Sequence, residues 1–153
     1  MTIIKLLCVT LLLMSTDLWA TEKTQHNYIS LRTNEVNLRS GPSIRYPIRF
    51  TYQRKGWPLK VLARFEDWKK VEDLDQTQGW IHESQLSQKR FVVITGSDVV
   101  KAYRLPVENA STILLLEKGV LAEVDSCKKN WCKIETYNNK VWVKQKYLWG
   151  VSP

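Results

Sequence analysis

Few side chains in this sequence could do covalent or metal chemistry. Cys127 and Cys132 stand close together, and the two histidines, His26 and His82, are far from them in the chain. A cysteine nucleophile needs a free thiol beside a positioned histidine, and zinc needs about four ligands. We therefore expect no catalytic thiol and no metal site, which leaves a disulfide as the remaining chemistry for the pair.

Other catalytic patterns are also missing from the sequence. Asp73 and Asp75 form an acidic pair beside Gln76 and Gln78, a setting that favours a solvated turn. The sequence contains no glycine-rich phosphate loop and no His-Glu-x-x-His zinc motif. We therefore predict that the protein is not an enzyme and uses no cofactor. An accessory amidase whose activity these motifs do not reveal stays open as an alternative.

The first twenty residues have the layout of a cleavable secretory signal. Lys5 gives a positive start, Leu6 to Met14 is an apolar run, and Ser15 to Ala20 is more polar and ends in a small residue. The run is too short to span a membrane, which needs roughly 20 apolar residues. We place the cleavage after Ala20, although Leu18 stands where a small residue is preferred; an uncleaved anchor is the alternative. We expect a periplasmic or secreted protein that is not integral to the membrane.

Export also bears on the cysteines. Cys8 lies in the apolar run and would leave with the signal, so the mature chain keeps only Cys127 and Cys132. An even number of cysteines in an oxidising compartment favours a disulfide. A loop this short would stabilise the fold by about 2 kcal/mol, enough to pin a hairpin.

The charge of the chain points to anionic partners. It carries 23 lysines and arginines against 15 acidic residues, a net charge of +8, and removal of Lys5 and Asp17 with the signal leaves that value unchanged. Such a surface attracts anions. Outside the cytoplasm these are cell-wall polymer, lipid head groups or acidic proteins. We do not expect nucleic acid, because the basic residues are spread along the chain and form no recognisable binding motif.

The sequence contains an internal repeat. The stretch "KGWPLKVLARFEDWKKVE" (residues 55–72) aligns without a gap with "KGVLAEVDSCKKNWCKIE" (residues 118–135), which brings Trp68 onto Trp131. Shorter blocks on either side recur in the same order with offsets that drift by one residue at the loops. Chance similarity among basic, tryptophan-rich strands is the alternative. We predict two tandem modules of ~60 residues each, at residues 28–90 and 91–153.

The elements that carry these residues have a period of two. Leu59, Val61, Ala63 and Phe65 share one face of their segment and Lys60 and Arg64 the other. Val36 and Leu38 oppose Asn37 and Arg39 in the same way. Further strands are expected at residues 48–53, 68–73, 79–82 and 91–95, separated by turn residues. The chain is therefore predicted to be all-β and to form small antiparallel barrels or sandwiches.

The strand phase also predicts where the tryptophans face. With Val71 inward, Trp68 points to the opposite, polar side of its strand, and the second module repeats this arrangement. By the same argument, Trp80 and His82 lie on the face of their strand opposite to that of Ile81. Outward tryptophans near basic side chains would form a groove able to anchor a partner. The alternative is that these rings cover a barrel mouth or are buried between the modules.

The stretches "VNLRSGPSIRYP", "KGWPLKVL", "WKKVE" and "GWIHESQL" together resemble the bacterial Src-homology-3 (SH3b) domain, in the branch found as exported tandem-module proteins of Gram-negative bacteria. The resemblance is close over Val36 to Leu86 and looser over Val100 to Val151. It implies two SH3-like β-barrels that are not catalytic and act as binding or targeting modules, often for peptidoglycan or its peptides. The second module lacks the Asn-x-Arg and Gly-Pro elements, so the resemblance implies its fold but not ligand binding.

The expected ligand-binding residues therefore lie in the first module. They are Asn37, Arg39, Tyr46, Trp68, Trp80 and His82. Gly41 and Pro42 are expected to make a turn, at which the reversal could need a positive φ. The predicted function is recognition of cell-wall peptidoglycan or its peptides through an aromatic and basic groove. The alternative is a scaffold that binds an envelope protein through an extended or proline-containing peptide.

Overall fold

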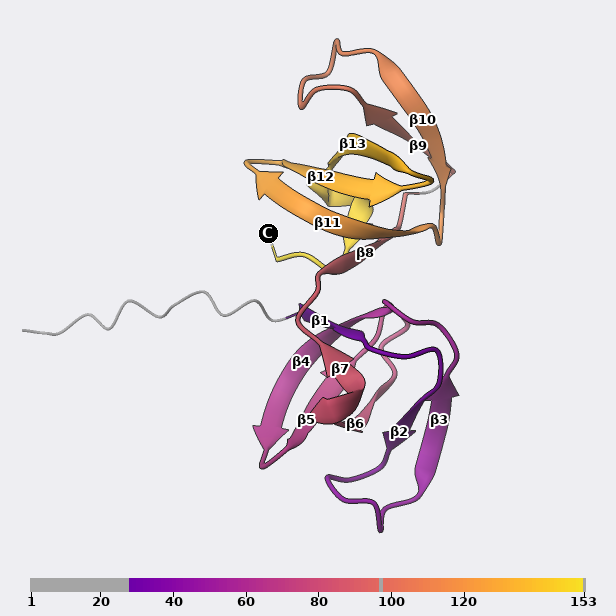
Figure 1. Ribbon diagram of the computed structural model, residues 1–153, viewed down its shortest axis with the longest axis vertical. Coiled ribbons are helices and arrows are strands. Elements are labelled where there is room, and N and C mark those ends of the chain that lie inside the picture. The colour runs from indigo at the N-terminus through magenta and orange to yellow at the C-terminus, as the bar shows by residue number, and fades with distance from the viewer. Residues whose placement is uncertain (1–27, 97, 153) are drawn as a thin grey trace, which may run out of the picture.

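The computed structural model describes residues 28–96 and 98–152 and contains two seven-stranded antiparallel sheets (Figure 1). The predicted signal, its cleavage site and His26 lie outside the described residues. The order of the strands is β3-β2-β6-β5-β4-β1-β7 in the first sheet and β10-β9-β13-β12-β11-β8-β14 in the second. The two orders are the same when the seven strands of each sheet are counted in sequence, so the repeat in the sequence is a repeat of topology.

The strands of the first sheet are short, and a single 3₁₀ turn, η1, separates its last two strands. Their bounds are β1 Tyr28–Leu31, β2 Val36–Arg39, β3 Ile48–Tyr52, β4 Pro58–Phe65, β5 Trp68–Glu72, β6 Gln78–His82, η1 Glu83–Gln85 and β7 Leu86–Ser87.

The second sheet repeats this layout, including the 3₁₀ turn before the last strand. Its elements are β8 Phe91–Ile94, β9 Val99–Tyr103, β10 Thr112–Glu117, β11 Leu121–Lys128, β12 Trp131–Thr136, β13 Asn139–Lys144, η2 Gln145–Tyr147 and β14 Leu148–Trp149. The predicted all-β class is confirmed. The predicted division at residues 28–90 and 91–153 stays a prediction.

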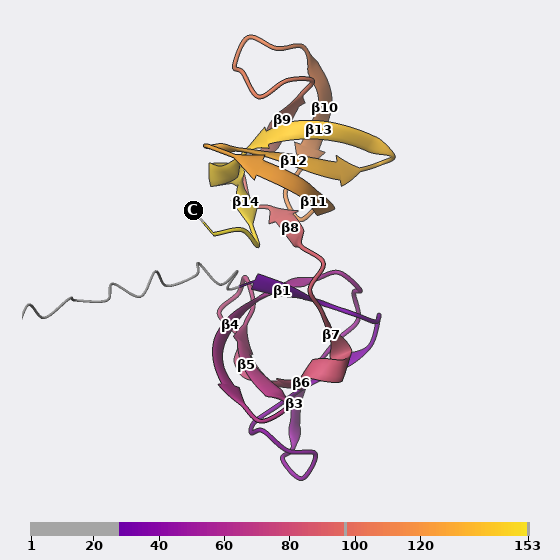
Figure 2. The ribbon, with the colours of Figure 1, turned by 60° about the vertical axis from the view of Figure 1, so that its left-hand side comes forward.

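The expected barrels are not closed. In the first sheet β3 and β7 are the end strands and have no ladder with each other in the described chain, although the sheet curls far round in Figure 2. The second sheet is open in the same way between β10 and β14. An open sheet leaves the outer backbone edge of β3 and of β10 without a neighbouring strand.

Each sheet encloses its own core. Leu38, Val71 and Ile81 are fully buried in the first, and Ile134 and Val141 in the second. The inward phase predicted for β2, β5 and β6 is therefore confirmed. Trp68 on β5 and Trp80 on β6 are partly exposed, which confirms their predicted outward phase.

The phase predicted for β4 is wrong beyond Val61. Val61 pairs with Val71, but the next paired residue is Ala63, opposite Lys70, so Leu62 forms a β-bulge. An extra residue in one strand moves every later side chain to the other face. Phe65, expected in the core, is accordingly 52% exposed.

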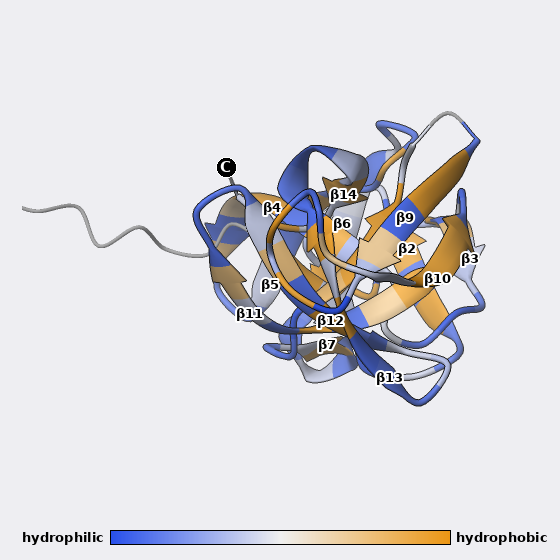
Figure 3. Ribbon diagram, turned by 90° about the horizontal axis from the view of Figure 1, so that it is seen from above, coloured by the Kyte–Doolittle hydropathy of each residue, from blue (hydrophilic) through white to orange (hydrophobic). Residues whose placement is uncertain are grey.

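Apolar side chains also remain exposed on the end strands β3 and β10. On β3, Ile48 and Phe50 are exposed, and on β10 Leu115 is exposed. Seen from above and coloured by hydropathy, β10 is largely apolar (Figure 3). These end strands therefore combine an unpaired backbone edge with apolar side chains.

The two sheets contact each other. Gly56, in the turn before β4, has φ +80, and a Cβ there would lie 3.1 Å from the ring of Phe91 on β8. The ring of Tyr28 meets that of Trp149 edge to face at 5.4 Å. Arg54 Nη1 donates to the carbonyl oxygen of Gly119 at 3.3 Å. The modules thus pack on one another through both side chains and backbone.

The predicted disulfide is confirmed. Cys127 on β11 and Cys132 on β12 lie opposite each other in the ladder and are bonded. In the first sheet the corresponding cross-strand pair is Arg64 and Lys69. The disulfide therefore pins the hairpin that carries Trp131 at the start of β12.

Candidate ligand-binding site

Four of the six residues predicted to bind a ligand meet around one hollow of the first sheet. Asn37 and Arg39 on β2, Trp68 on β5 and His82 on β6 line a volume of about 300 Å³. The strands that carry them are neighbours in the sheet, and all four side chains are on the outward phase. The sequence pattern thus identified one continuous surface feature.

Trp68 and His82 form the aromatic wall of this hollow. They are directly opposite each other in the β5–β6 ladder, and their rings meet edge to face at 5.3 Å. The backbone N–H of Ser84 donates to Nδ1 of His82 at 3.2 Å. The same Nδ1 lies 2.8 Å from the hydroxyl oxygen of Ser84, so η1 holds the imidazole from one side.

Arg39 shapes the hollow as well as lining it. Its Nη1 donates to the carbonyl oxygens of Ile44 at 3.2 Å and Tyr46 at 2.9 Å. The guanidinium therefore holds the loop at residues 40–47 in place over the end of β2. Part of its hydrogen-bonding capacity is structural, which the sequence did not indicate.

Asn37 lies on the same outward side of β2 as Arg39. Its Oδ1 accepts a hydrogen bond from the hydroxyl of Thr51 on β3 at 2.9 Å. The bond from Thr51 fixes the side chain of Asn37. The NH₂ group of the same amide has two N–H donors, which can serve a ligand.

Tyr46 and Trp80, the other two predicted residues, do not line this hollow. Trp80 is partly exposed on β6, opposite Arg39 and Lys70 in the ladders. The ring of Tyr46 packs over Gly41, where a Cβ would lie 2.6 Å from the ring. Gly41 does not have a positive φ, so the reason for glycine at this turn is the close approach of Tyr46 and not the backbone reversal.

Three lining residues were missed by sequence reasoning. They are Ile44, Ser84 and Gln85. Ile44 is 77% exposed at the tip of the loop, and Ser84 and Gln85 belong to η1. The sequence feature that could have identified them is their position next to predicted residues. Ile44 is in the loop after Gly41-Pro42, and Ser84 and Gln85 are in the turn after His82.

The hollow offers groups that can bind a polar ligand. Its lining supplies a flat aromatic surface, a cation, an amide and an imidazole. Among the residues the structure describes, no group of three or more histidine, cysteine or acidic side chains could hold a metal ion. No helix within residues 28–96 and 98–152 is long and apolar enough to cross a membrane.

A model of the bacterial SH3 domain matches two regions of the sequence, residues 32–88 and 96–150, which together make up most of the chain. The chain belongs to the bacterial SH3 domain family. The resemblance seen in the sequence is confirmed, and it extends over both modules. A search of curated proteins finds no significant match.

The bacterial SH3 pair is also similar to parts of larger solved structures. One is NlpC2 from Trichomonas vaginalis, with 12% identity and a TM-score of 0.37 over 82% of this chain and 48% of that chain. Another is an NlpC/P60 family protein from Bacillus cereus ATCC 10987, with 14% identity and a TM-score of 0.35 over 80% of this chain and 55% of that chain. This chain spans about half the length of each.

Proposed function

We propose that this protein is a non-catalytic, exported binding module that recognises cell-wall peptidoglycan or its peptides through the hollow of the first sheet. The observation that carries the proposal is the meeting of Asn37, Arg39, Trp68 and His82 around that hollow. Membership of the bacterial SH3 domain family supports it, because such domains commonly act as binding modules.

The chemistry of the lining suits a peptide with polar and charged groups. The ring of Trp68 gives a flat apolar contact, as aromatic anchors do in protein interfaces. The cation of Arg39 and the amide of Asn37 can orient carboxylate and amide groups beside it. The net charge of +8 adds a long-range attraction to anionic wall polymer.

Retention on purified peptidoglycan sacculi tests this proposal. The mature protein should be retained at low salt, and Trp68→Ala should weaken retention by about thirtyfold, the factor that corresponds to the ~2 kcal/mol lost when an aromatic anchor is truncated. Tyr137→Ala is the matched control, since it removes an exposed aromatic side chain in the turn between β12 and β13 of the second module, outside the hollow. No retention at low salt, or an equal loss in both variants, would reject the proposal.

A second candidate function rests on the open edge of the first sheet. The exposed Ile48 and Phe50 on the end strand β3 favour a scaffold that adds an extended peptide of an envelope protein as a further strand. Cross-linking to a defined protein partner that is lost in Phe50→Ala and kept in Trp68→Ala would support this function over wall binding. The reverse pattern would place a protein partner in the hollow instead.

The proposal includes export and the absence of catalysis. Intact mass of the protein recovered from the periplasm or medium should correspond to cleavage near Ala20. The proposal also keeps the two modules at 28–90 and 91–153 on that one chain. Incubation with wall fragments should give no new products. Release of a fragment by the purified protein, lost when the protein is heat-denatured, would make it an enzyme.

A further inference from the structure

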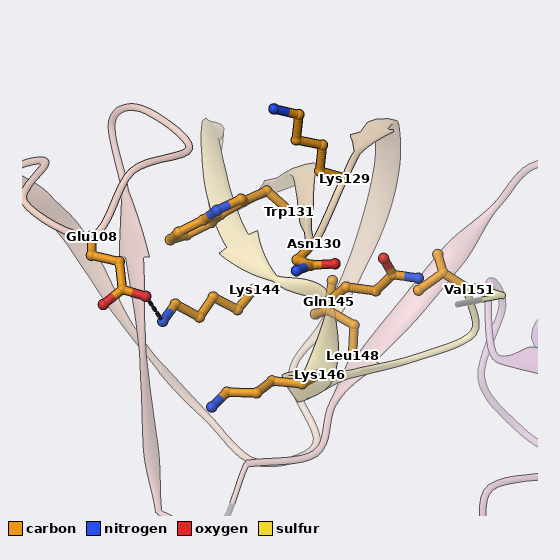
Figure 4. Close-up of a pocket in the computed structure, with 9 residues that line it drawn as sticks. All are labelled: Glu108, Lys129, Asn130, Trp131, Lys144, Gln145, Lys146, Leu148 and Val151. Atoms are coloured by element: carbon orange, nitrogen blue, oxygen red, sulfur yellow. Dashed lines mark hydrogen bonds and ion pairs between the residues drawn. The ribbon is translucent and has the colours of Figure 1, made fainter.

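A larger hollow lies at the corresponding place of the second sheet. It has a volume of about 710 Å³, within the range of small-molecule sites. Figure 4 shows the ring of Trp131 across it, with Lys144 and Lys146 below the ring and Glu108 at one side. Sequence reasoning did not predict this site, because the second module lacks the motif elements of the first.

The loops beside the two hollows have the same backbone hydrogen bonds. In the first module Ser40 N donates to Pro47 O, Ser43 N to Gly41 O and Tyr46 N to Ser43 O. In the second module Arg104 N donates to Ser111 O, Val107 N to Leu105 O and Ala110 N to Val107 O. The two loops therefore correspond residue by residue in their hydrogen bonds, and Glu108 takes the place of Ile44.

The strand ladders extend the correspondence to the floor of the hollow. Trp131 is opposite Lys144, just as Trp68 is opposite His82. Two residues later in each turn, Lys146 takes the place of Ser84. The second hollow has thus kept its tryptophan and exchanged an isoleucine, a histidine and a serine for a carboxylate and two lysines.

The two loops are also held in different ways. In the first module Arg39 holds the loop through backbone carbonyls, as described above. In the second module Tyr103 replaces that arginine, and its ring instead meets Trp131 edge to face at 5.5 Å. The loop tip is tied by the ion pair of Glu108 with Lys144, whose Nζ also lies 5.7 Å from the centre of the Trp131 ring.

The balance of charge in the hollow is positive. Lys129, Lys144 and Lys146 line it against the single carboxylate of Glu108. The hydrogen bond from Lys144 lowers the pKa of Glu108, and the bond to Glu108 raises the pKa of Lys144, so both groups are charged at neutral pH. The carboxylate of Glu108 is 75% exposed whereas Lys144 is 26% exposed.

We propose that the hollow around Trp131 is a second ligand site, which takes a carboxylate-bearing ligand, and that Glu108 occupies the position of the ligand's carboxylate when the site is empty. Lys144 is the cation that the ligand's carboxylate contacts, Lys146 adds attraction, and the Trp131 ring supports the adjoining part of the ligand. The ligand's carboxylate can displace that of Glu108 because an exposed ion pair is weak. Breaking the pair with Lys144 also releases the side chain that ties the loop tip.

The test uses pairs of probes that differ only in charge. N-acetylphenylalanine is compared with N-acetylphenylalaninamide for a peptide carboxylate, and glucuronate with glucuronamide for a sugar acid. Binding to ¹⁵N-labelled mature protein is followed at the indole N–H resonance of Trp131, identified by its loss in Trp131→Phe. At least one acid should bind and shift that resonance, and its neutral partner should bind more weakly, by up to about fivefold, the upper value for an exposed ion pair.

Variants separate the two charged roles. Glu108→Gln removes the resident carboxylate and should tighten binding of the acid by up to about fivefold. Lys144→Met, which keeps the apolar stem, should weaken binding of the acid by up to the same factor. Lys55→Gln changes the net charge by the same amount as Lys144→Met but lies in the first module, so it should leave binding within twofold.

Several results would overturn the proposal. They are equal binding of acid and neutral probe, no binding of either acid at millimolar concentration, weaker binding in Glu108→Gln, and full binding in Lys144→Met. Should Glu108→Gln lose the dispersion of a folded spectrum, the Lys144→Met comparison decides alone. Failure of wall retention through Trp68 leaves this site untouched, because the two hollows lie in different sheets.

Discussion

A close approach between β6 and β2 gives the sharpest test of the fold. Gly79 on β6 faces Leu38 on β2, and a Cβ at Gly79 would lie 2.5 Å from Leu38 Cγ and 2.8 Å from the carbonyl oxygen of Arg39. Leu38 is fully buried and the oxygen belongs to the backbone, so neither can move aside freely. Gly79→Ala should therefore destabilise the first module by about 1–3 kcal/mol, the usual cost of overpacking a core.

The second module indicates how this cost can be relieved. At the positions of Leu38 and Gly79 it carries Ala102 and Val141, both fully buried. The first module thus combines a large residue on β2 with glycine on β6. The second module combines a small residue on β9 with a larger residue on β13. We expect Leu38→Ala alone to cost about 2–5 kcal/mol through the cavity that it leaves, and Gly79→Val alone to cost more than Gly79→Ala.

The double variant Leu38→Ala with Gly79→Val copies the second module and should recover much of that loss. A double-mutant cycle measures the recovery, with a coupling of about 0.5–3 kcal/mol in favour of the pair. Equilibrium urea unfolding of the mature protein gives the four free energies, at constant slope with denaturant. Additive losses in the double variant, or a Gly79→Ala protein as stable as the parent, would refute the packing argument.

Two further predictions concern the disulfide and a buried tyrosine. Replacing Cys127 and Cys132 together by serine should lower the unfolding free energy by at least about 2 kcal/mol; the oxidised parent should show no thiol on denaturation, and two thiols would contradict the bond. Burial, and then the hydrogen bond that its hydroxyl donates to Asp73, raise the pKa of Tyr52. Above about pH 10 the folded protein keeps the phenolic proton of Tyr52, whereas the unfolded chain loses it. The contribution of Tyr52 to the free energy of unfolding is therefore complete below about pH 10 and falls as the pH rises above that value. Urea titrations at pH 9 to 11 should give a shallower fall for Tyr52→Phe, and equal slopes in the two proteins would contradict this explanation.

The strands could be predicted wherever one side of the segment is apolar and the other is charged. On β5 Lys70 and Glu72 flank Val71, and on β6 Trp80 and His82 flank Ile81, so the apolar residue marks the inward face of each strand. The same pattern gave no sign that Lys69, on the face of Val71, is buried as well and pairs with Glu83. The prediction failed on β4 because "VLARF" has apolar residues at consecutive positions and carries no signal for the bulge at Leu62. A bulge is set by the pairing with β5, which a local pattern does not contain.

The aromatic half of the first hollow was also within reach of the sequence. Trp68 and His82 follow from strand phase alone, because neighbouring strands bring outward residues together. Ile44 did not follow, since a loop has no periodicity, and neither did the bonds from Arg39 to the loop, which depend on the folded path of residues 40–47. The second hollow was missed for a different reason: the second module lacks the Asn-x-Arg and Gly-Pro elements that drew attention to the first, although it keeps the tryptophan at the same position.

The duplication supplies an internal comparison that separates fold from recognition. Positions that face the cores keep an apolar type between the modules, as in Val36 with Val100 and Val71 with Ile134, and the tryptophan at the start of β5 and β12 is identical. Positions at the rims of the hollows change their chemistry, from isoleucine and histidine to glutamate and lysine. Packing constrains the first set in both modules alike, whereas the second set lies at the surface of the two proposed sites. Because the rim positions differ while the frame that presents them stays the same, we expect the two proposed sites to prefer different ligands, and a chain that carries both would engage two features of one partner at a separation set by the contact between its sheets.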